Sequence, residues 1–213
     1  AYLEFPHDAE IFGVQPHCHS RCYSTKLRIR YPDGSEKLLL NQPIYDFSWQ
    51  REYHFDKLLE VPKGSLLIAD YVYDNSDNNK SNPDPKKDVT FGEQTSEEML
   101  FTFARFRFKG ETTDNRHDEW FRELQGNVTF GALDDNIDGK LVAAEFRNDP
   151  RFKPVVAYLP MVDADKDGAL SKGEMAKAMQ MMQQMRRQQP AAAAPKDDAG
   201  TAAMKQAATG QAN

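Results

Sequence analysis

Cysteine and histidine are scarce in this chain, which has two cysteines and five histidines among 213 residues. Two cysteines are too few for a framework of disulfide bonds, but the length suffices for a sizeable core in one large or two smaller units. Basic residues are also in deficit, 27 against 33 acidic ones, and the net charge of −6 argues against binding to nucleic acid or an anionic membrane. Long apolar runs are absent, which excludes a membrane-spanning helix. Metal cations are therefore the favoured charged partners.

Residues 1–110 alternate apolar and polar side chains in the manner of half-buried β-strands. Leu27, Ile29 and Tyr31 would share one face of a strand, and the Pro-Asp-Gly turn at 32–34 predicts a hairpin with the strand that follows. Further strands are predicted at 45–50, 53–58, 65–74 and 97–108, with a long loop at 74–88. Many short strands without a helical period between them predict a mainly β domain, a jelly-roll-like β-sandwich.

The composition changes after this domain. Residues 111–189 contain short helix-like segments around two acidic loops, which predicts a small α-helical second domain. Residues 190–213 are rich in Ala, Pro and Gln and have little to bury, so this tail is predicted to be disordered. Four methionines precede the tail at helical spacing: Met175, Met179, Met182 and Met185. Such a stripe predicts a packing face, with a copper relay or a partner-binding surface as the alternative.

The two acidic loops each have twelve residues and match the pattern D-x-[DN]-x-[DN]-G-x5-E. The first, 134–145, reads DDNIDGKLVAAE, and the second, 163–174, reads DADKDGALSKGE. In such loops alternate oxygen ligands converge on one Ca²⁺, glycine allows a sharp turn at the sixth position, and the seventh position contributes its backbone carbonyl. The predicted calcium ligands are Asp134, Asn136, Asp138, Lys140 and Glu145 in the first loop, and Asp163, Asp165, Asp167, Ala169 and Glu174 in the second.

The tandem loops resemble those of the EF-hand family. Leu141 and Leu170, at the eighth positions, are where paired loops of that family pack on each other. The second loop has one more negative ligand than the first, where Asn136 replaces an aspartate, so it is expected to bind Ca²⁺ more tightly. Two alternatives are a chance pair of acidic turns and a degenerate structural pair that no longer responds to calcium.

Four of the seven histidine and cysteine residues lie in one short stretch, GVQPHCHSRCY, residues 13–23. On an extended strand His17 and His19 project to the same face, where they could share one metal ion. Cys18 would point away from them. On an unbroken strand Cys18 and Cys22 would be roughly 13 Å apart, beyond the reach of a disulfide bond, so a bridge would require a turn between them. Cys22 as an additional metal ligand stays open.

The histidine pair is followed by a predicted hairpin, an aromatic segment, a long loop and the sequence GEQTSEEM at 92–99. This order, over residues 5–108, resembles the C-terminal copper domain of the type II, ascorbate-dependent copper monooxygenases, including their bacterial members. The resemblance implies that His17, His19 and Met99 are the catalytic copper ligands, where O₂ is activated and a C–H bond of an organic substrate is hydroxylated. It also implies ascorbate as an external reductant. Two neutral imidazoles and a thioether are a ligand set that suits copper.

The same family uses a second, electron-transfer copper held by three histidines on a preceding domain. His7, His54 and His117 are scattered in this sequence and predict no such cluster, so the resemblance implies a separate electron-transfer copper domain or another redox partner. The alternative is a non-enzymatic metal-binding or interaction module stabilised by calcium. Both hypotheses predict a periplasmic or secreted protein, because calcium is abundant and copper more accessible outside the cytoplasm.

Overall fold

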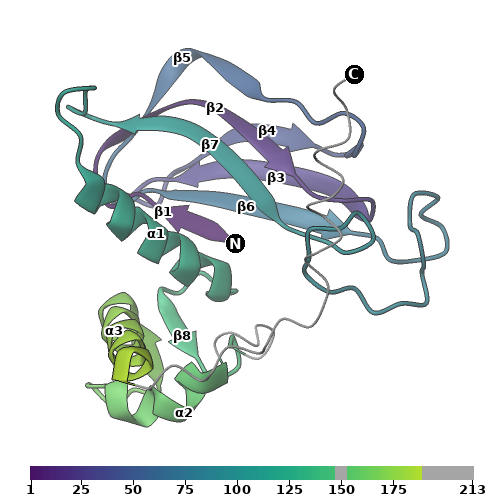
Figure 1. The fold of residues 1–213 in the computed structure, drawn as a ribbon. Helices are drawn as coiled ribbons and strands as arrows, with labels where there is room; N and C mark the ends of the chain where they lie inside the picture. The colour runs from purple at the N-terminus through teal and green to yellow at the C-terminus, as the bar shows by residue number, and fades with distance from the viewer. Residues whose placement is uncertain (147–152, 189–213) are drawn as a thin grey trace, which may run out of the picture.

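The computed structural model describes residues 1–146 and 153–188, and its fold is mainly β. The predicted disordered tail, 190–213, lies outside the described residues. Two antiparallel sheets face each other, which is consistent with the predicted β-sandwich (Figure 1). In sheet order, the first sheet contains β1 (Tyr2–Glu4), β6 (Leu66–Tyr73), β3 (Cys22–Arg30) and β4 (Glu36–Gln42). The second contains β5 (Tyr53–Val61), β2 (Ala9–His17) and β7 (Phe101–Phe108).

The core between the sheets follows the alternating pattern of the sequence. Ile11 and Val14 of β2, and Leu27 and Ile29 of β3, are fully buried, while their neighbours along each strand are mostly more exposed. Phe108, the last residue of β7, is also fully buried and closes one end of this core. Burial of one face of each sheet is what a period of two predicts for an antiparallel sandwich.

The predicted hairpin is confirmed, because β3 and β4 pair antiparallel with Arg30 opposite Glu36. The turn between them contains Gly34 at φ +82°, a left-handed conformation that glycine adopts without steric cost. The strand predicted at 45–50 is wrong. There the carboxylate of Asp46 accepts a hydrogen bond from the Ser48 backbone N–H at 2.8 Å, and this local turn replaces strand pairing.

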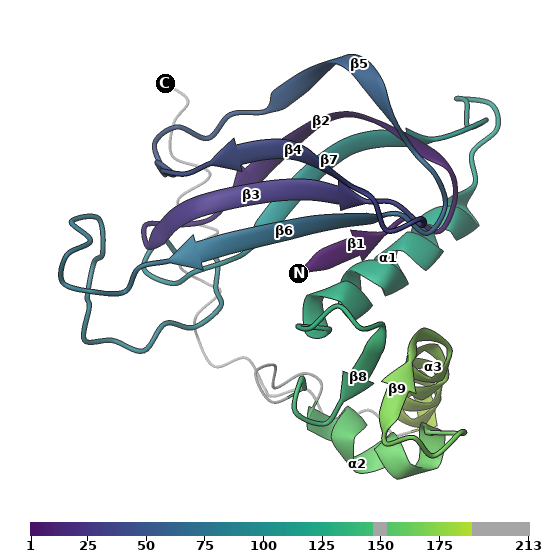
Figure 2. The same cartoon turned by 180° about the vertical axis from the view of Figure 1, so that it is seen from behind.

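Helix α1 (Asp118–Leu133) joins the sandwich to the second half of the chain, and it lies along the β1 edge of the first sheet (Figure 2). Near its start, Trp120 and Leu124 pack into the core between the sheets. Near its end, Phe130 and Leu133 pack into a second core. The two cores therefore share a helix, although the sequence separates them at residue 110.

The second core belongs to the paired acidic loops. Its elements are β8 (Lys140–Val142), α2 (Lys153–Val162), β9 (Ala169–Ser171) and α3 (Lys172–Gln188). The strands β8 and β9 pair antiparallel with Leu141 opposite Leu170, and both leucines are fully buried. The predicted methionine packing face is confirmed for Met175, Met179 and Met182, which lie in or against this core. The side chain of Met185 lies outside the described part of the chain. No helix among residues 1–146 and 153–188 combines the length and apolar character needed to cross a membrane.

Two glycines of α1 should respond in opposite directions to substitution by alanine. A Cβ at Gly131 would overlap the backbone carbonyl oxygen of Tyr2, whereas a Cβ at Gly126 would meet nothing within 4 Å. We therefore expect Gly131→Ala to lower the free energy of unfolding by about 1–3 kcal/mol, because α1 must move away from β1. Gly126→Ala should raise it by about 0.5–1 kcal/mol through the better helix propensity of alanine. Urea unfolding of both variants measures this, and changes of the same sign would contradict the close approach of α1 to β1.

Candidate metal centres

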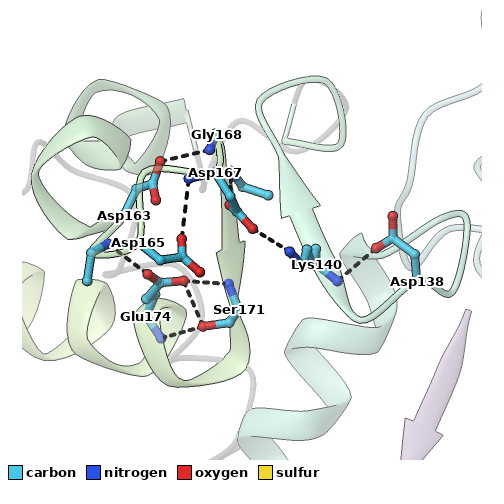
Figure 3. A network of polar contacts seen from close by, with 10 residues as sticks. Asp138, Lys140, Asp163, Asp165, Asp167, Gly168, Ser171 and Glu174 are labelled. Carbon is cyan, nitrogen blue, oxygen red and sulfur yellow. Dashed lines mark hydrogen bonds and ion pairs between the residues drawn. The ribbon is translucent and has the colours of Figure 1, made fainter.

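The second acidic loop gathers three carboxylates at one point. One ligand oxygen from each of Asp163, Asp165 and Glu174 lies within 4.8 Å of the others (Figure 3). Oδ2 of Asp163 accepts a hydrogen bond from the Gly168 N–H at 3.0 Å. The other oxygen, Oδ1, is shielded from solvent and has no hydrogen-bond partner among the described residues. A buried anionic oxygen without a partner is costly, and a cation bound between these carboxylates would relieve that cost.

The geometry of Glu174, the predicted twelfth ligand, is fixed by hydrogen bonds. Its carboxylate accepts bonds from the Ser171 hydroxyl at 2.7 Å, the Ser171 backbone N–H at 2.9 Å and the Ala164 N–H at 2.7 Å (Figure 3). These bonds lower the pKa of Glu174 to about 2, and the bond from the Ser171 hydroxyl is the largest cause. The carboxylate is therefore ionised at neutral pH and held in the place where a calcium loop needs a ligand with two oxygens.

The first loop has the same backbone form. Gly139 and Gly168 occupy equivalent sixth positions with φ of 79° and 84°. In this loop the carboxylate of Asp134 is buried, and it accepts bonds from the Asp138 N–H at 3.2 Å and the Gly139 N–H at 2.9 Å. The Asn136 side chain, however, donates a 2.8 Å bond to Asp138. Among the described residues, clustering of three ligand carboxylates is found in the second loop and not in this one.

Lys140 connects the two loops. The seventh position was predicted to contribute only a carbonyl oxygen, but the ammonium group of Lys140 forms an ion pair with Asp167 of the second loop (Figure 3). The hydrogen bond from this lysine is the main cause that lowers the pKa of Asp167. Asp167 therefore points toward the neighbouring loop rather than into the cluster of Asp163, Asp165 and Glu174. The ten predicted calcium ligands thus lie in two adjacent loops, but their side chains converge fully in neither.

The histidine pair lies at the opposite end of the sequence, where β2 ends. The rings of His17 and His19 have centroids 5.2 Å apart and are nearly perpendicular. Nδ1 of His17 donates to Oε1 of Gln50 at 2.6 Å, and Nδ1 of His19 donates to the carbonyl oxygen of Glu97 at 3.1 Å. The orientation of the Gln50 amide is fixed, because its Nε2 donates to the carbonyl oxygen of Phe47 at 2.8 Å.

These bonds determine the tautomer of both rings. An oxygen that only accepts hydrogen bonds requires a proton on the Nδ1 atom that faces it, which leaves the lone pair of Nε2 available in each neutral imidazole. A hydrogen bond from one ring nitrogen to a carbonyl oxygen is the usual way in which proteins orient a metal-binding histidine. A neutral His17 or His19 with this hydrogen bond would therefore present Nε2 as its metal-binding atom.

The segment that contains Met99 lies against this histidine pair. Phe101, two residues later, pairs with His17 across strands β7 and β2. The carboxylate of Glu98 accepts hydrogen bonds from the backbone N–H of His19 at 2.9 Å and of Arg21 at 2.6 Å. The structure thus brings together the two chain segments that contain the predicted copper ligands. Strand β7 begins at Phe101 and not at residue 97, since Glu97 and Glu98 are hydrogen-bonded to the residues that follow β2 instead.

A disulfide bond joins Cys18 and Cys22, which is the alternative that requires a turn between them. Strand β2 ends at His17, a turn follows in which the Cys22 N–H donates to the carbonyl oxygen of His19 at 3.1 Å, and the two Cα atoms are 6.0 Å apart. The bond leaves no free thiolate, so Cys22 is not an additional metal ligand. Arg21 stabilises the turn from within, because its buried guanidinium donates to Asn75 Oδ1 at 2.8 Å and to the Ser96 carbonyl oxygen at 2.9 Å.

The other histidines form no second site within the described residues. The rings of His7 and His117 stack on Trp120, with centroid distances of 4.3 and 3.8 Å. His54 is exposed and lies 3.6 Å from a carboxylate oxygen of Glu52. Among the described residues, the aromatic rings that contact His17 and His19 are each other's and that of Phe47, and not those of these three histidines.

A groove of about 550 Å³ opens beside His19. Aromatic side chains on its walls include Tyr23, Tyr45 and Phe47, and polar ones from the loop that follows β6 include Asn79. Models of known protein families give no match to this chain, and neither do curated proteins. The chemistry of both centres is therefore inferred from the geometry of this chain.

Proposed function

We propose that this protein binds copper through His17, His19 and Met99, and calcium through its two acidic loops. The observation that carries the copper proposal is the paired Nδ1 hydrogen bonding of the two histidines, which leaves both Nε2 lone pairs for one metal. A thioether beside two imidazoles favours copper over zinc or magnesium. Three protein ligands would also leave an open coordination position for O₂ or water.

The resemblance to the type II copper monooxygenases extends this proposal to catalysis. Copper bound here would supply O₂ activation and hydroxylation of a C–H bond, with ascorbate as the external reductant. The groove beside His19 is of a size that suits an organic substrate, and it offers both aromatic and polar side chains for contact with one. The electron-transfer copper would come from another domain or redox partner. In this proposal residues 1–110 are a jelly-roll-like copper domain and residues 111–189 an EF-hand pair.

Calcium is proposed for the loop pair on the strength of the second loop. Its three clustered carboxylates and the unpartnered Oδ1 of Asp163 fit a hard cation with oxygen ligands. The residues of the first loop would complete the pair. Constant occupation of both loops would fit a periplasmic or secreted protein, where calcium is abundant.

Metal analysis and titration test the proposal. We expect the purified chain to bind about one equivalent of copper and about two of calcium. Replacing His17, His19 and Met99 together by alanine should weaken Cu(I) binding by at least about 100-fold, because all three ligands are lost. His54→Ala is the matched control, since this exposed histidine lies outside the site. Equal Cu(I) affinity in the wild-type chain and the triple variant, measured by competition with a Cu(I) chelator, would refute the copper site.

A non-enzymatic metal-binding module is the second candidate. It is favoured by the absence of a second histidine cluster from the described residues, since a lone copper site has no electron donor within the same chain. Oxygen uptake with ascorbate and equimolar copper separates the two candidates. Uptake above the free-copper background that the triple variant lacks would support the monooxygenase. Tight copper binding without such uptake would support the module.

A further inference from the structure

Tyr2 reaches from the sandwich into the first acidic loop. Its hydroxyl donates a 2.7 Å hydrogen bond to Oδ2 of Asp134, although the two residues are 132 positions apart. Both side chains are buried, with exposed fractions of 6% for Tyr2 and 1% for Asp134. A tyrosine hydroxyl is protonated at physiological pH, so it is a donor to Asp134.

This bond leaves the two oxygens of Asp134 with different capacities. Among the described residues, Oδ2 accepts from the Tyr2 hydroxyl and from the Gly139 N–H at 2.9 Å, whereas Oδ1 accepts one bond, from the Asp138 N–H at 3.2 Å. A carboxylate oxygen has about two lone-pair sites, so Oδ2 is saturated while Oδ1 retains one. Asp134 holds the first position of the loop, where calcium loops take a carboxylate ligand. The Tyr2 bond thus orients the carboxylate with Oδ1 as the free ligand oxygen.

The backbone around Tyr2 makes this contact part of the docking between β1 and α1. The Cα of Gly131 approaches the carbonyl oxygen of Tyr2 so closely that no Cβ fits between them. Two residues further along β1, the Glu4 carbonyl oxygen accepts a 2.9 Å bond from Asn127 of α1, and the Glu4 carboxylate pairs with Lys172 of α3. On its other side, Tyr2 pairs with Ile68 of β6. Strand β1 is therefore the edge strand of the first sheet and lies between β6 and α1.

We infer that Tyr2 is a positioning residue for the first calcium loop, and that calcium binding there is linked to the docking of β1. The inference rests on the proposed calcium function. An outer hydrogen bond to a ligand typically changes metal affinity by about 10–100-fold when it is removed. Linkage is reciprocal, so calcium in the first loop stabilises the position of Tyr2 and with it the pairing of β1 with β6.

Calcium titration of the full chain tests this with one loop disabled at a time. Glu174→Gln removes the bidentate ligand of the second loop and Glu145→Gln that of the first. We expect Tyr2→Phe to weaken calcium binding by at least about 10-fold in the Glu174→Gln chain and by less than about two-fold in the Glu145→Gln chain. Phenylalanine keeps the packing of the ring and removes only the donor. Tyr31→Phe is the matched control, because its hydroxyl makes no hydrogen bond within the described residues.

Hydrogen exchange provides the second readout. Calcium should slow exchange of the amides that pair β1 with β6 in the wild-type chain, and Tyr2→Phe should abolish that effect. Unchanged affinity of the first loop in Tyr2→Phe, or equal losses in both loops, would overturn this inference alone. If the wild-type, Glu174→Gln and Glu145→Gln chains, all with Tyr2 intact, bind no calcium at all, the proposed calcium function is overturned together with the inference.

Discussion

Replacing Phe108 by alanine should lower the free energy of unfolding by about 3–5 kcal/mol, the range found when a fully buried aromatic ring is deleted. The ring of Phe108 is completely buried at the junction of β7 and α1. It makes edge contacts with Phe106, Trp120 and Phe121 at centroid distances of 5.3, 5.5 and 5.3 Å. Sheet and helix backbones surround the ring, so they can collapse only partly into the cavity that its loss creates. Urea unfolding followed by tryptophan fluorescence measures the change and also reports on the environment of Trp120.

Phe103 supplies the matched control on the same strand. It lies on the opposite face of β7, is 50% exposed, and has one aromatic neighbour, Phe101, at a centroid distance of 4.7 Å. Phe103→Ala should therefore cost less than about 1 kcal/mol. The identical substitution thus distinguishes the buried end of the sandwich from its solvent-exposed face. Equal losses in the two variants would contradict the assignment of Phe108 to the core that joins β7 to α1.

The structural features predicted best from the sequence are those whose determinants are local. The β3–β4 hairpin follows from alternating residues and a Pro-Asp-Gly turn within about twenty residues. The turns of the acidic loops follow from Gly139 and Gly168, since each twelve-residue loop contains its own turn. The segment 45–50 was misassigned because its aromatic residues suggest a strand, while the Asp46 side chain forms a turn with the backbone two residues later.

Contacts between distant segments do not follow from alternation, because alternation does not specify which strands pair. The meeting of the histidine pair with the Met99 segment was implied only by the resemblance to the copper monooxygenases. The approach of His17 to the Met99 segment depends on the register of β2 with β7, which places His17 opposite Phe101. The Tyr2–Asp134 bond likewise depends on the docking of α1 along β1. The ion pair of Lys140 had a signal in the sequence. Lys140 begins β8, which pairs with β9 of the second loop, and from this position its side chain reaches Asp167.

Glu98 was also missed, since the sequence suggests only a polar neighbour of Met99. In the structure its buried carboxylate holds the backbone N–H groups of both His19 and Arg21. Strong hydrogen bonds from two N–H groups to one carboxylate fix the turn that follows β2. On the copper proposal, this carboxylate sets the position of His19 relative to the backbone of Met99. On that proposal, Glu98 would be a positioning residue for the copper site and not a ligand.

Replacing Glu98 by alanine should therefore weaken Cu(I) binding by about 10–100-fold, the usual effect of removing a group that orients a metal ligand. It should also destabilise the chain by about 2–4 kcal/mol, because two buried backbone donors lose their acceptor. Glu97→Gln is the matched control. The carboxylate of Glu97 accepts a bond from the Gln94 N–H, and only the backbone carbonyl oxygen of Glu97 contacts His19, so the Cu(I) affinity of Glu97→Gln should stay within about two-fold of wild type.

Glu98→Gln separates the positioning of His19 from the packing of the side chain. It keeps the volume and one acceptor oxygen but turns its amide NH₂ toward one of the two donors, so a loss intermediate between those of Glu97→Gln and Glu98→Ala is expected. Chelator competition at a temperature where circular dichroism shows every variant folded isolates the binding effect from stability, and indistinguishable affinities for Glu98→Ala and Glu97→Gln would refute the positioning role.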